Sequence, residues 1–107
     1  MYARLVRLRI RDNEVERAAS IFELQALPQL KQQLGFVAAA LLVQPPATGA
    51  AIMIMWRERW HSERLERDGF YREQIAKFDS VFAAPPEAEL YEVRVWTGYG
   101  PGAEERR

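Results

Sequence analysis

Apolar and polar residues alternate along two segments of the chain, Tyr2 to Ile10 and Glu89 to Trp96. Alternation with a period of two is typical of a β-strand that buries one face. Both segments are therefore predicted as strands. In the first strand, one face carries Tyr2, Arg4, Val6, Leu8 and Ile10, and the other carries Ala3, Leu5, Arg7 and Arg9.

Two further segments, Phe36 to Val43 and Ala51 to Trp56, are apolar throughout. Short continuous apolar runs bounded by glycine and proline favour strands that are buried on both faces. The connection between them, Gln44 to Ala50, contains two prolines and a glycine, which is typical of a turn. We predict that the two strands form a hairpin.

Apolar residues recur at helical spacing from Val15 to Leu34, which predicts a first helix. Asn13 and Glu16 have the spacing of a capping box at its start. Pro28 lies inside this helix and removes one backbone hydrogen bond. A kink is therefore expected between Leu24 and Leu27.

A second helical region follows the third strand. Ser62 is the expected N-cap, and Asp68-Gly69 predicts a break in the helix. The helical pattern resumes from Phe70 to Phe82. It ends at Ala83 to Pro86, because proline cannot continue a helix.

The order strand, helix, strand, strand, helix, strand is that of a ferredoxin-like α+β fold. It predicts a four-stranded antiparallel sheet with two helices on one face, within a single domain over residues 1–97. The glycine-rich, charged tail from Gly98 to Arg107 is expected to be disordered. Because the helices cover one face only, the apolar second and third strands would expose a patch to water. A homodimer that stacks sheet on sheet, closing a dimeric α/β barrel, would cover that patch.

Composition restricts the classes of function. Fifteen basic residues balance fifteen acidic ones, which removes the simplest argument for a nucleic-acid or anionic-membrane partner. The chain has no cysteine, so disulfides, thiolate catalysis and cysteine metal sites are excluded, and we expect no metal. The N-terminus does not resemble a signal peptide and no apolar run approaches a membrane span. The expected location is the cytoplasm.

The segment Ile52 to Arg67 holds two tryptophans and the chain's single histidine. Trp56, at the end of the third strand, could anchor that strand end or form a wall of a cavity. His61 could act as a general base near neutral pH. Its charged neighbours favour instead a helix start or a solvent-facing junction, with an interface contact as a third alternative.

Other polar and aromatic side chains are candidates for binding a substrate. Arg4 on an apolar strand face needs a carboxylate or a ligand anion. Glu92 and Arg94 on the last strand are the neighbours expected beside the first strand, and anchoring an acidic substrate is the alternative. Tyr71 and Tyr91 could donate hydrogen bonds to a substrate oxygen. Phe70 is a candidate apolar contact beside Tyr71, and Met53 and Met55 are expected to fill the dimer interface.

Six segments resemble antibiotic biosynthesis monooxygenase-type domains of the dimeric α/β barrel superfamily: MYARLVRLRI, LPQLKQQLGF, AAALLV, MIMWRE, GFYREQIAKF and ELYEVRVW. The markers are the Leu-Pro within the first helix, the Gly-Phe after it and the Trp at the end of the third strand. The resemblance covers about Met1 to Trp96. It implies a homodimer with a cavity in each subunit between the sheet and the helices.

Some members of this family are cofactor-free monooxygenases acting on phenolic compounds, and others degrade haem. The haem-degrading branch uses an Asn, a Trp and a His where this sequence has approximately Val6, Leu65 and Ile75, which argues against that activity. The resemblance therefore implies a cofactor-free monooxygenase-like enzyme for a hydrophobic or phenolic substrate. His61 and Tyr71 are its candidate catalytic residues, and Arg4, Trp56, Phe70 and Tyr91 its candidate binding residues. The alternative is a non-catalytic dimeric domain that binds a small ligand or only assembles.

Overall fold

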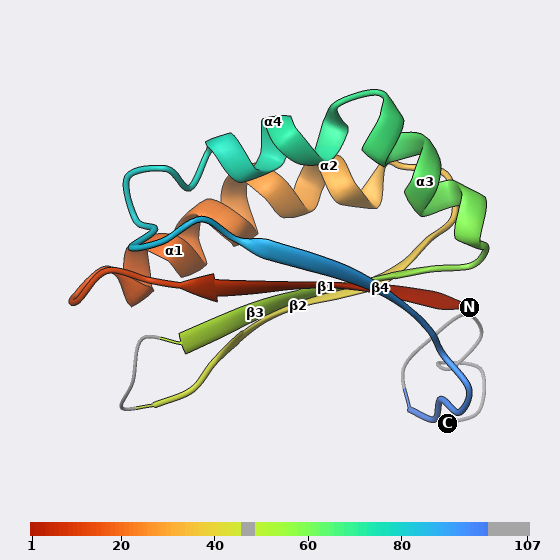
Figure 1. Cartoon of the computed structure of the whole chain (residues 1–107), viewed down its shortest axis with the longest axis horizontal. Helices are drawn as coiled ribbons and strands as arrows, with labels where there is room; N and C mark the ends of the chain where they lie inside the picture. Colours follow the sequence, from red (N-terminus) through yellow and green to blue (C-terminus); the bar gives the residue numbers. More distant parts are fainter. Residues whose placement is uncertain (46–48, 99–107) are drawn as a thin grey trace.

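Four antiparallel strands form one sheet, and the helices all lie on one of its faces (Figure 1). The computed structural model describes residues 1–45 and 49–98. The strand order is β2-β3-β1-β4. The strands are β1 (Tyr2–Arg9), β2 (Phe36–Val43), β3 (Gly49–Trp56) and β4 (Glu87–Glu92). The predicted ferredoxin-like fold and the β2–β3 hairpin are confirmed.

The last strand is shorter than the alternating pattern predicts. β4 pairs with β1, and Glu92 lies opposite Tyr2 at the end of that ladder. Beyond this point β1 has no further strand residue to pair with, and Val93 N–H donates one last bond to the Met1 carbonyl at 2.8 Å. The segment Val93 to Trp96 therefore leaves the sheet although its sequence still alternates.

The first helical region consists of α1 (Val15–Ile21), a π-helix η1 (Phe22–Ala26) and α2 (Leu27–Lys31). The predicted irregularity before Pro28 is thus a π-helical segment, since proline has no N–H to continue the α-helical ladder. The predicted capping box is wrong. Glu14 is the N-cap without a side-chain cap bond, and Asn13 instead takes a left-handed backbone with φ 64°.

The second helical region consists of α3 (Arg59–Arg67) and α4 (Phe70–Ala76), separated at Asp68-Gly69 as predicted. Gly69 has φ 85°, which glycine adopts without strain. The helix ends earlier than its pattern predicts. The Val81 carbonyl accepts from Arg11 N–H at 2.8 Å, and Phe82 forms a bridge with Ile10, so the chain has to leave the helix to meet the end of the sheet.

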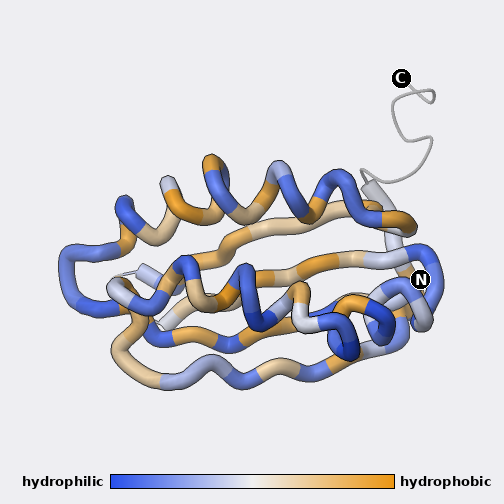
Figure 2. Tube along the Cα trace, turned by 90° about the horizontal axis from the view of Figure 1, so that it is seen from above, coloured by the Kyte–Doolittle hydropathy of each residue, from blue (hydrophilic) through white to orange (hydrophobic). Residues whose placement is uncertain are grey.

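The core lies between the sheet and the helices. Its largest fully buried side chains outside the open face are Trp56, Phe78, Ile10, Leu65 and Val81. The rings of Phe78 and Phe82 stack with centroids 5.5 Å apart. In Figure 2, which looks down on the helices, hydrophobic and hydrophilic residues alternate along the helical turns, as expected for helices that bury one side.

No helix of the described residues covers the other sheet face, which is called the open face (Figure 1). Cross-strand partners on it form rows, including Ala40–Met53–Leu5–Glu89 and Leu42–Ala51–Arg7–Glu87. The rows are apolar on β2 and β3 and charged on β4. Arg7 forms an ion pair with Glu89. The hydrogen bond from Arg7, and to a smaller extent the one from Tyr91, holds the pKa of Glu89 below its usual range.

Two further findings concern the described residues as a whole. Within residues 1–45 and 49–98, no helix has both the length and the apolar character needed to cross a bilayer. The same residues contain no group of three histidine or acidic side chains arranged to hold a metal ion. The tail predicted as disordered lies outside the described residues, apart from Gly98.

Candidate functional site

Arg4 and Tyr71 form the centre of the candidate site. Arg4 lies on the helix-facing side of β1, with Val6 and Leu8, and its side chain is 15% exposed. Its guanidinium carbon lies 3.7 Å from the centroid of the Tyr71 ring, a cation–π contact. Its Nη1 donates to Glu66 Oε2 at 2.5 Å. The predicted need of Arg4 for a carboxylate is confirmed, but the partner comes from α3 and not from the last strand.

The Tyr71 hydroxyl is buried among polar groups. It lies 2.7 Å from Ser62 Oγ. The indole N–H of Trp56 faces the same hydroxyl without reaching hydrogen-bonding geometry, and its nitrogen has no partner among the described residues. Burial raises the pKa of Tyr71, and the Ser62 hydrogen bond and the Arg4 charge offset only part of that increase. At neutral pH the group is therefore a phenol that can donate a hydrogen bond.

This raised pKa gives a prediction about alkaline stability. Because the pKa of Tyr71 is higher in the folded than in the unfolded chain, its contribution is complete below about pH 10 and is lost as the pH rises through the folded value. Urea unfolding between pH 8 and 11 should therefore show a steeper fall in unfolding free energy for the wild type than for Tyr71→Phe. The control Tyr91→Phe, at an exposed ring, should keep the steep fall. Equal slopes for all three proteins would contradict this assignment.

A small cavity lies behind this pair, between the sheet and the helices, with a volume of about 30 Å³. Its walls are mostly apolar, and its polar members are Arg4, Tyr71 and Gln74. The remaining lining residues are Val6, Phe22, Ala26, Leu30, Ile52, Ile54, Ile75 and Phe78. A water molecule fits this volume, whereas ligand sites usually measure about 300–1,000 Å³. An aromatic ligand would require wall side chains to move.

A shallower hollow of about 250 Å³ lies outside the same pair. Glu66 and Arg72 line it, and it shares Arg4, Tyr71 and Ile75 with the inner cavity. The stacked Arg4 and Tyr71 thus separate the surface hollow from the apolar interior. A ligand that enters by this route meets a guanidinium and a ring before it reaches the cavity.

The structure brings only part of the predicted site together. Trp56 is fully buried beside Tyr71 and packs edge-on against Phe36, with ring centroids 6.0 Å apart. Phe70 is half-buried, and its ring lies 6.1 Å from that of Tyr71. Tyr91 lies on the open face, where its hydroxyl donates to Glu89 at 3.1 Å. It is therefore separated from the cavity by the sheet.

His61 lies at the start of α3, away from the cavity. Its Nδ1 accepts from Glu58 N–H at 3.1 Å, and Glu58 accepts from the His61 backbone N–H in return, which makes a capping box. The helix-start interpretation of His61 is confirmed. The solvent-facing position is wrong, because the residue is 6% exposed. A catalytic role for His61 stays a prediction that this position does not favour.

Sequence reasoning missed Ser62, Glu66 and Gln74 as members of the site. Ser62 was expected to cap the helix, but the cap lies four residues earlier, at Glu58. Gln74 is buried and donates to Gln29 Oε1 at 2.8 Å, linking α4 to α2. Ser62 and Glu66 are spaced i, i+4 and so share one face of α3 with the buried Leu65. That spacing could have indicated that Ser62 and Glu66 lie near Leu65 on one face of the helix. The prediction of the N-cap at Ser62 placed this residue outside the helix.

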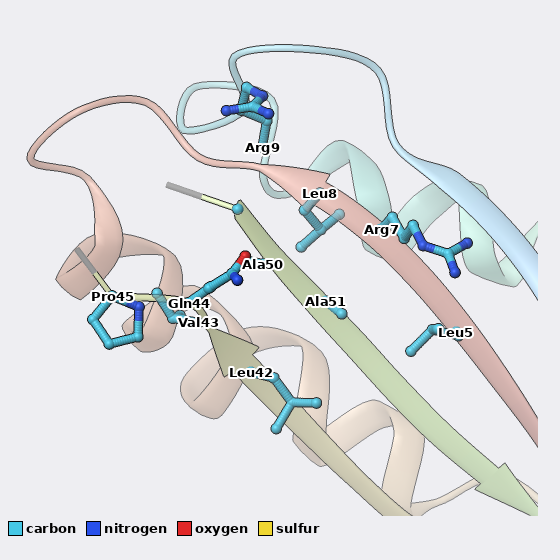
Figure 3. A pocket seen from close by; sticks show the side chains of 11 residues that line it. Leu5, Arg7, Leu8, Arg9, Leu42, Val43, Gln44, Pro45, Ala50 and Ala51 are labelled. Carbon is cyan, nitrogen blue, oxygen red and sulfur yellow. The ribbon is translucent and has the colours of Figure 1, made fainter. Parts of the chain in front are cut away.

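A broader hollow of about 670 Å³ lies on the open face. Figure 3 looks onto it, with the helices behind the sheet and with Leu5, Arg7, Ala51 and Leu42 on the near side. Its floor is mainly apolar, and arginine side chains of β1 lie at one border. This hollow is on the opposite side of the sheet from Arg4 and Tyr71.

Comparison with known proteins shows which solved structures share this fold. No protein-family model matches the chain, and no curated protein matches its sequence. Solved structures do match. One is a monooxygenase from the gene ActVA-Orf6 of Streptomyces coelicolor, in complex with nanaomycin D, with a TM-score of 0.75 and 13% identity over 90% of this chain and 89% of that chain. The fold is that of the antibiotic biosynthesis monooxygenases.

Two other solved structures support the same statement. SnoaB, a cofactor-independent oxygenase from Streptomyces nogalater, has a TM-score of 0.71 and 16% identity over 89% of this chain and 94% of its own. A protein of unknown function from Nitrosomonas europaea has a TM-score of 0.71 and 18% identity over 90% of this chain and 91% of its own. At such identities the likeness concerns the fold, and the resemblance seen in the sequence is confirmed at that level.

Proposed function

We propose that the protein is a cofactor-independent, monooxygenase-like enzyme that oxidises a hydrophobic phenolic substrate held against Arg4 and Tyr71. The observation that carries this proposal is the stacked Arg4–Tyr71 pair at the mouth of a mostly apolar cavity. The fold shared with an oxygenase described as cofactor-independent supports it.

The chemistry needs little from the protein beyond charge and shape. A phenol that loses its proton to water becomes a phenolate, and the Arg4 guanidinium stabilises that anion. Tyr71, kept neutral, donates a second hydrogen bond to the same oxygen while Ser62 donates to Tyr71. Arg4 cannot act as a base, because guanidinium stays protonated.

Electrons for the reaction come from the substrate itself. The electron-rich ring carbon of the phenolate reduces O2 and forms a C–O bond, which gives a hydroperoxide. Loss of water then leaves a quinone, so that phenol and O2 yield quinone and H2O. One oxygen atom enters the product and the other leaves as water, and no external reductant is consumed.

Admission of such a substrate requires the mouth to open. Glu66 is more than half exposed and holds Arg4 from the surface, so its carboxylate can swing into solvent. Release of Arg4 from Glu66 frees the guanidinium for a substrate oxygen. Arg4 Nε and Trp56 Nε1, which have no partner among the described residues, supply two further buried donors beside Tyr71. A substrate carrying one or two oxygens would satisfy groups that are otherwise unpaired.

The enzymatic proposal is tested by oxygen uptake with a panel of naphthols and hydroquinones under ¹⁸O2. We expect product with one ¹⁸O atom, and for Arg4→Met a kcat/KM lower by about 100-fold, the usual effect of removing one group that stabilises an oxyanion. The matched control Arg17→Met removes an exposed arginine of α1 and should leave turnover unchanged. Turnover that survives in both Arg4→Met and Tyr71→Phe would show that the reaction occurs elsewhere.

The alternative is a non-catalytic dimeric domain that binds a small ligand or only assembles. The observation that favours it is the cavity volume of about 30 Å³, which is too small for an aromatic ring without rearrangement. A wild-type protein that is stabilised against heat by panel members, yet consumes no oxygen with any of them, would support this alternative.

A further inference from the structure

Another hollow, of about 490 Å³, lies at the junction of α2, β2 and α3, away from Arg4 and Tyr71. Lys31, Arg57 and His61 line it, together with the apolar side chains of Leu34 and Phe36. Among the described residues that line this hollow, none is acidic. Two cationic side chains therefore converge on one concave surface without a carboxylate on its walls.

His61 lines this hollow, and one hydrogen bond and one ring contact hold its imidazole in place. Its Nδ1 accepts the Glu58 N–H, so Nδ1 carries no proton and the neutral ring must carry its proton on Nε2. The tilted Trp60 ring, with its centroid 4.1 Å away, packs on the imidazole, and Gly35 leaves room for the imidazole because it has no Cβ. The residue is only 6% exposed, and its Nε2 makes no hydrogen bond within residues 1–45 and 49–98. Nε2 is not among the fully buried unpartnered atoms of the described residues, so this donor remains accessible from the cationic hollow.

We propose that this hollow binds a phosphate group, with His61 Nε2–H and Arg57 donating to its oxygens and Lys31 supplying a further charge. A planar guanidinium and an ammonium are the two side chains that most often recognise phosphate. Leu34 is 60% exposed and Phe36 is half-buried, and both border the same space. Their position suits an organic phosphate whose apolar part rests on them.

Phosphate binding can be read from one signal, because the chain contains a single histidine. We expect inorganic phosphate, titrated at constant ionic strength into the full chain, to shift the ¹⁵N resonance of His61 Nε2 along a saturable curve. Phenyl phosphate should bind several-fold more tightly. Equal affinity for inorganic phosphate and phenyl phosphate would show that Leu34 and Phe36 do not contribute to binding. A linear shift, or the same shift with chloride, would overturn the proposal.

Two variants separate this site from general charge effects. Arg57→Gln should weaken phosphate binding by about tenfold, the usual effect of losing one charge-assisted hydrogen bond. Arg17→Gln, which removes an equal charge on α1, should leave the affinity unchanged. Equal weakening in the two variants would mean that phosphate responds to the overall charge of the chain and not to this hollow, which would contradict the proposal. The His61 ring also reports on the helix start. If Arg57→Gln only destabilised that helix start, the Nδ1 hydrogen bond would be lost, and both ring nitrogen signals would differ from those of the wild type before phosphate is added.

Discussion

Alanine at position 35 is expected to lower the free energy of unfolding by about 3 kcal/mol. Two costs combine at this residue. Gly35 has φ 84°, a left-handed backbone that costs an alanine roughly 1–2 kcal/mol. In addition, a Cβ at this position would overlap the imidazole of His61. Forcing extra atoms into a packed site costs typically about 1–3 kcal/mol.

The chain offers a matched control for this experiment at Gly69. That residue has φ 85°, almost the same backbone angle, but the nearest atom to an added Cβ is the end of the Arg72 side chain at 3.6 Å. Gly69→Ala should therefore show the backbone cost without the overlap. Thermal unfolding should place Gly35→Ala roughly 10–20 °C below the wild type and Gly69→Ala much nearer to it. Equal losses in both variants would show that His61 does not occupy the space beside Gly35.

Aspartate at position 53 is expected to disrupt a proposed dimer of this protein. We propose that two copies pack open face to open face, because that face is apolar on β2 and β3 and no helix of the described part of the chain covers it. Met53 lies in its middle, between Ala40 and Leu5. Two-fold packing would place two such carboxylates in one interface, and burial of unpaired charge is costly. The dissociation constant should rise by about 100-fold or more, since about 1.4 kcal/mol corresponds to each factor of ten.

Sedimentation equilibrium from micromolar to millimolar protein measures this effect. Leu42→Asp is a second variant, at a side chain that is already 52% exposed and so tolerates a charge in the monomer. Leu24→Asp is the control, because Leu24 is 71% exposed on the helical layer and outside the open face. Dissociation in both open-face variants, with Leu24→Asp unaffected, supports the proposed dimer. A wild type that is monomeric at every concentration would rule out both this interface and the dimeric α/β barrel.

The two arginines of β1 show how far the alternating pattern reaches. The pattern correctly assigned Arg4 to the core-facing side and Arg7 to the other side, because residues two apart on a strand share a face. It also indicated that Arg4 needs an anion. The pattern did not identify Glu66 as that anion, because the two residues are 62 positions apart and meet only through helix packing.

Helix boundaries were only partly predictable from the sequence. Pro28 and Gly69 acted through their own backbone chemistry, so the irregularity near the first and the break at the second were predictable from single residues. The start of α3 was not, because Glu58 and His61 are unusual capping residues and a serine lay nearby. Placing the cap at Ser62 hid the hydroxyl that the structure puts against Tyr71.

What the sequence by itself determined is the order of the strands and helices, the faces of the strands and hence the ferredoxin-like fold, since these follow from local periodicity and from proline and glycine. The tertiary structure alone decided which side chains meet. It placed Arg4, Tyr71, Ser62 and Trp56 together, moved Tyr91 to the far side of the sheet and fixed His61 as a buried cap beside Gly35. The reason is physical: periodicity sets the direction of a side chain, whereas its neighbours depend on how separate elements pack.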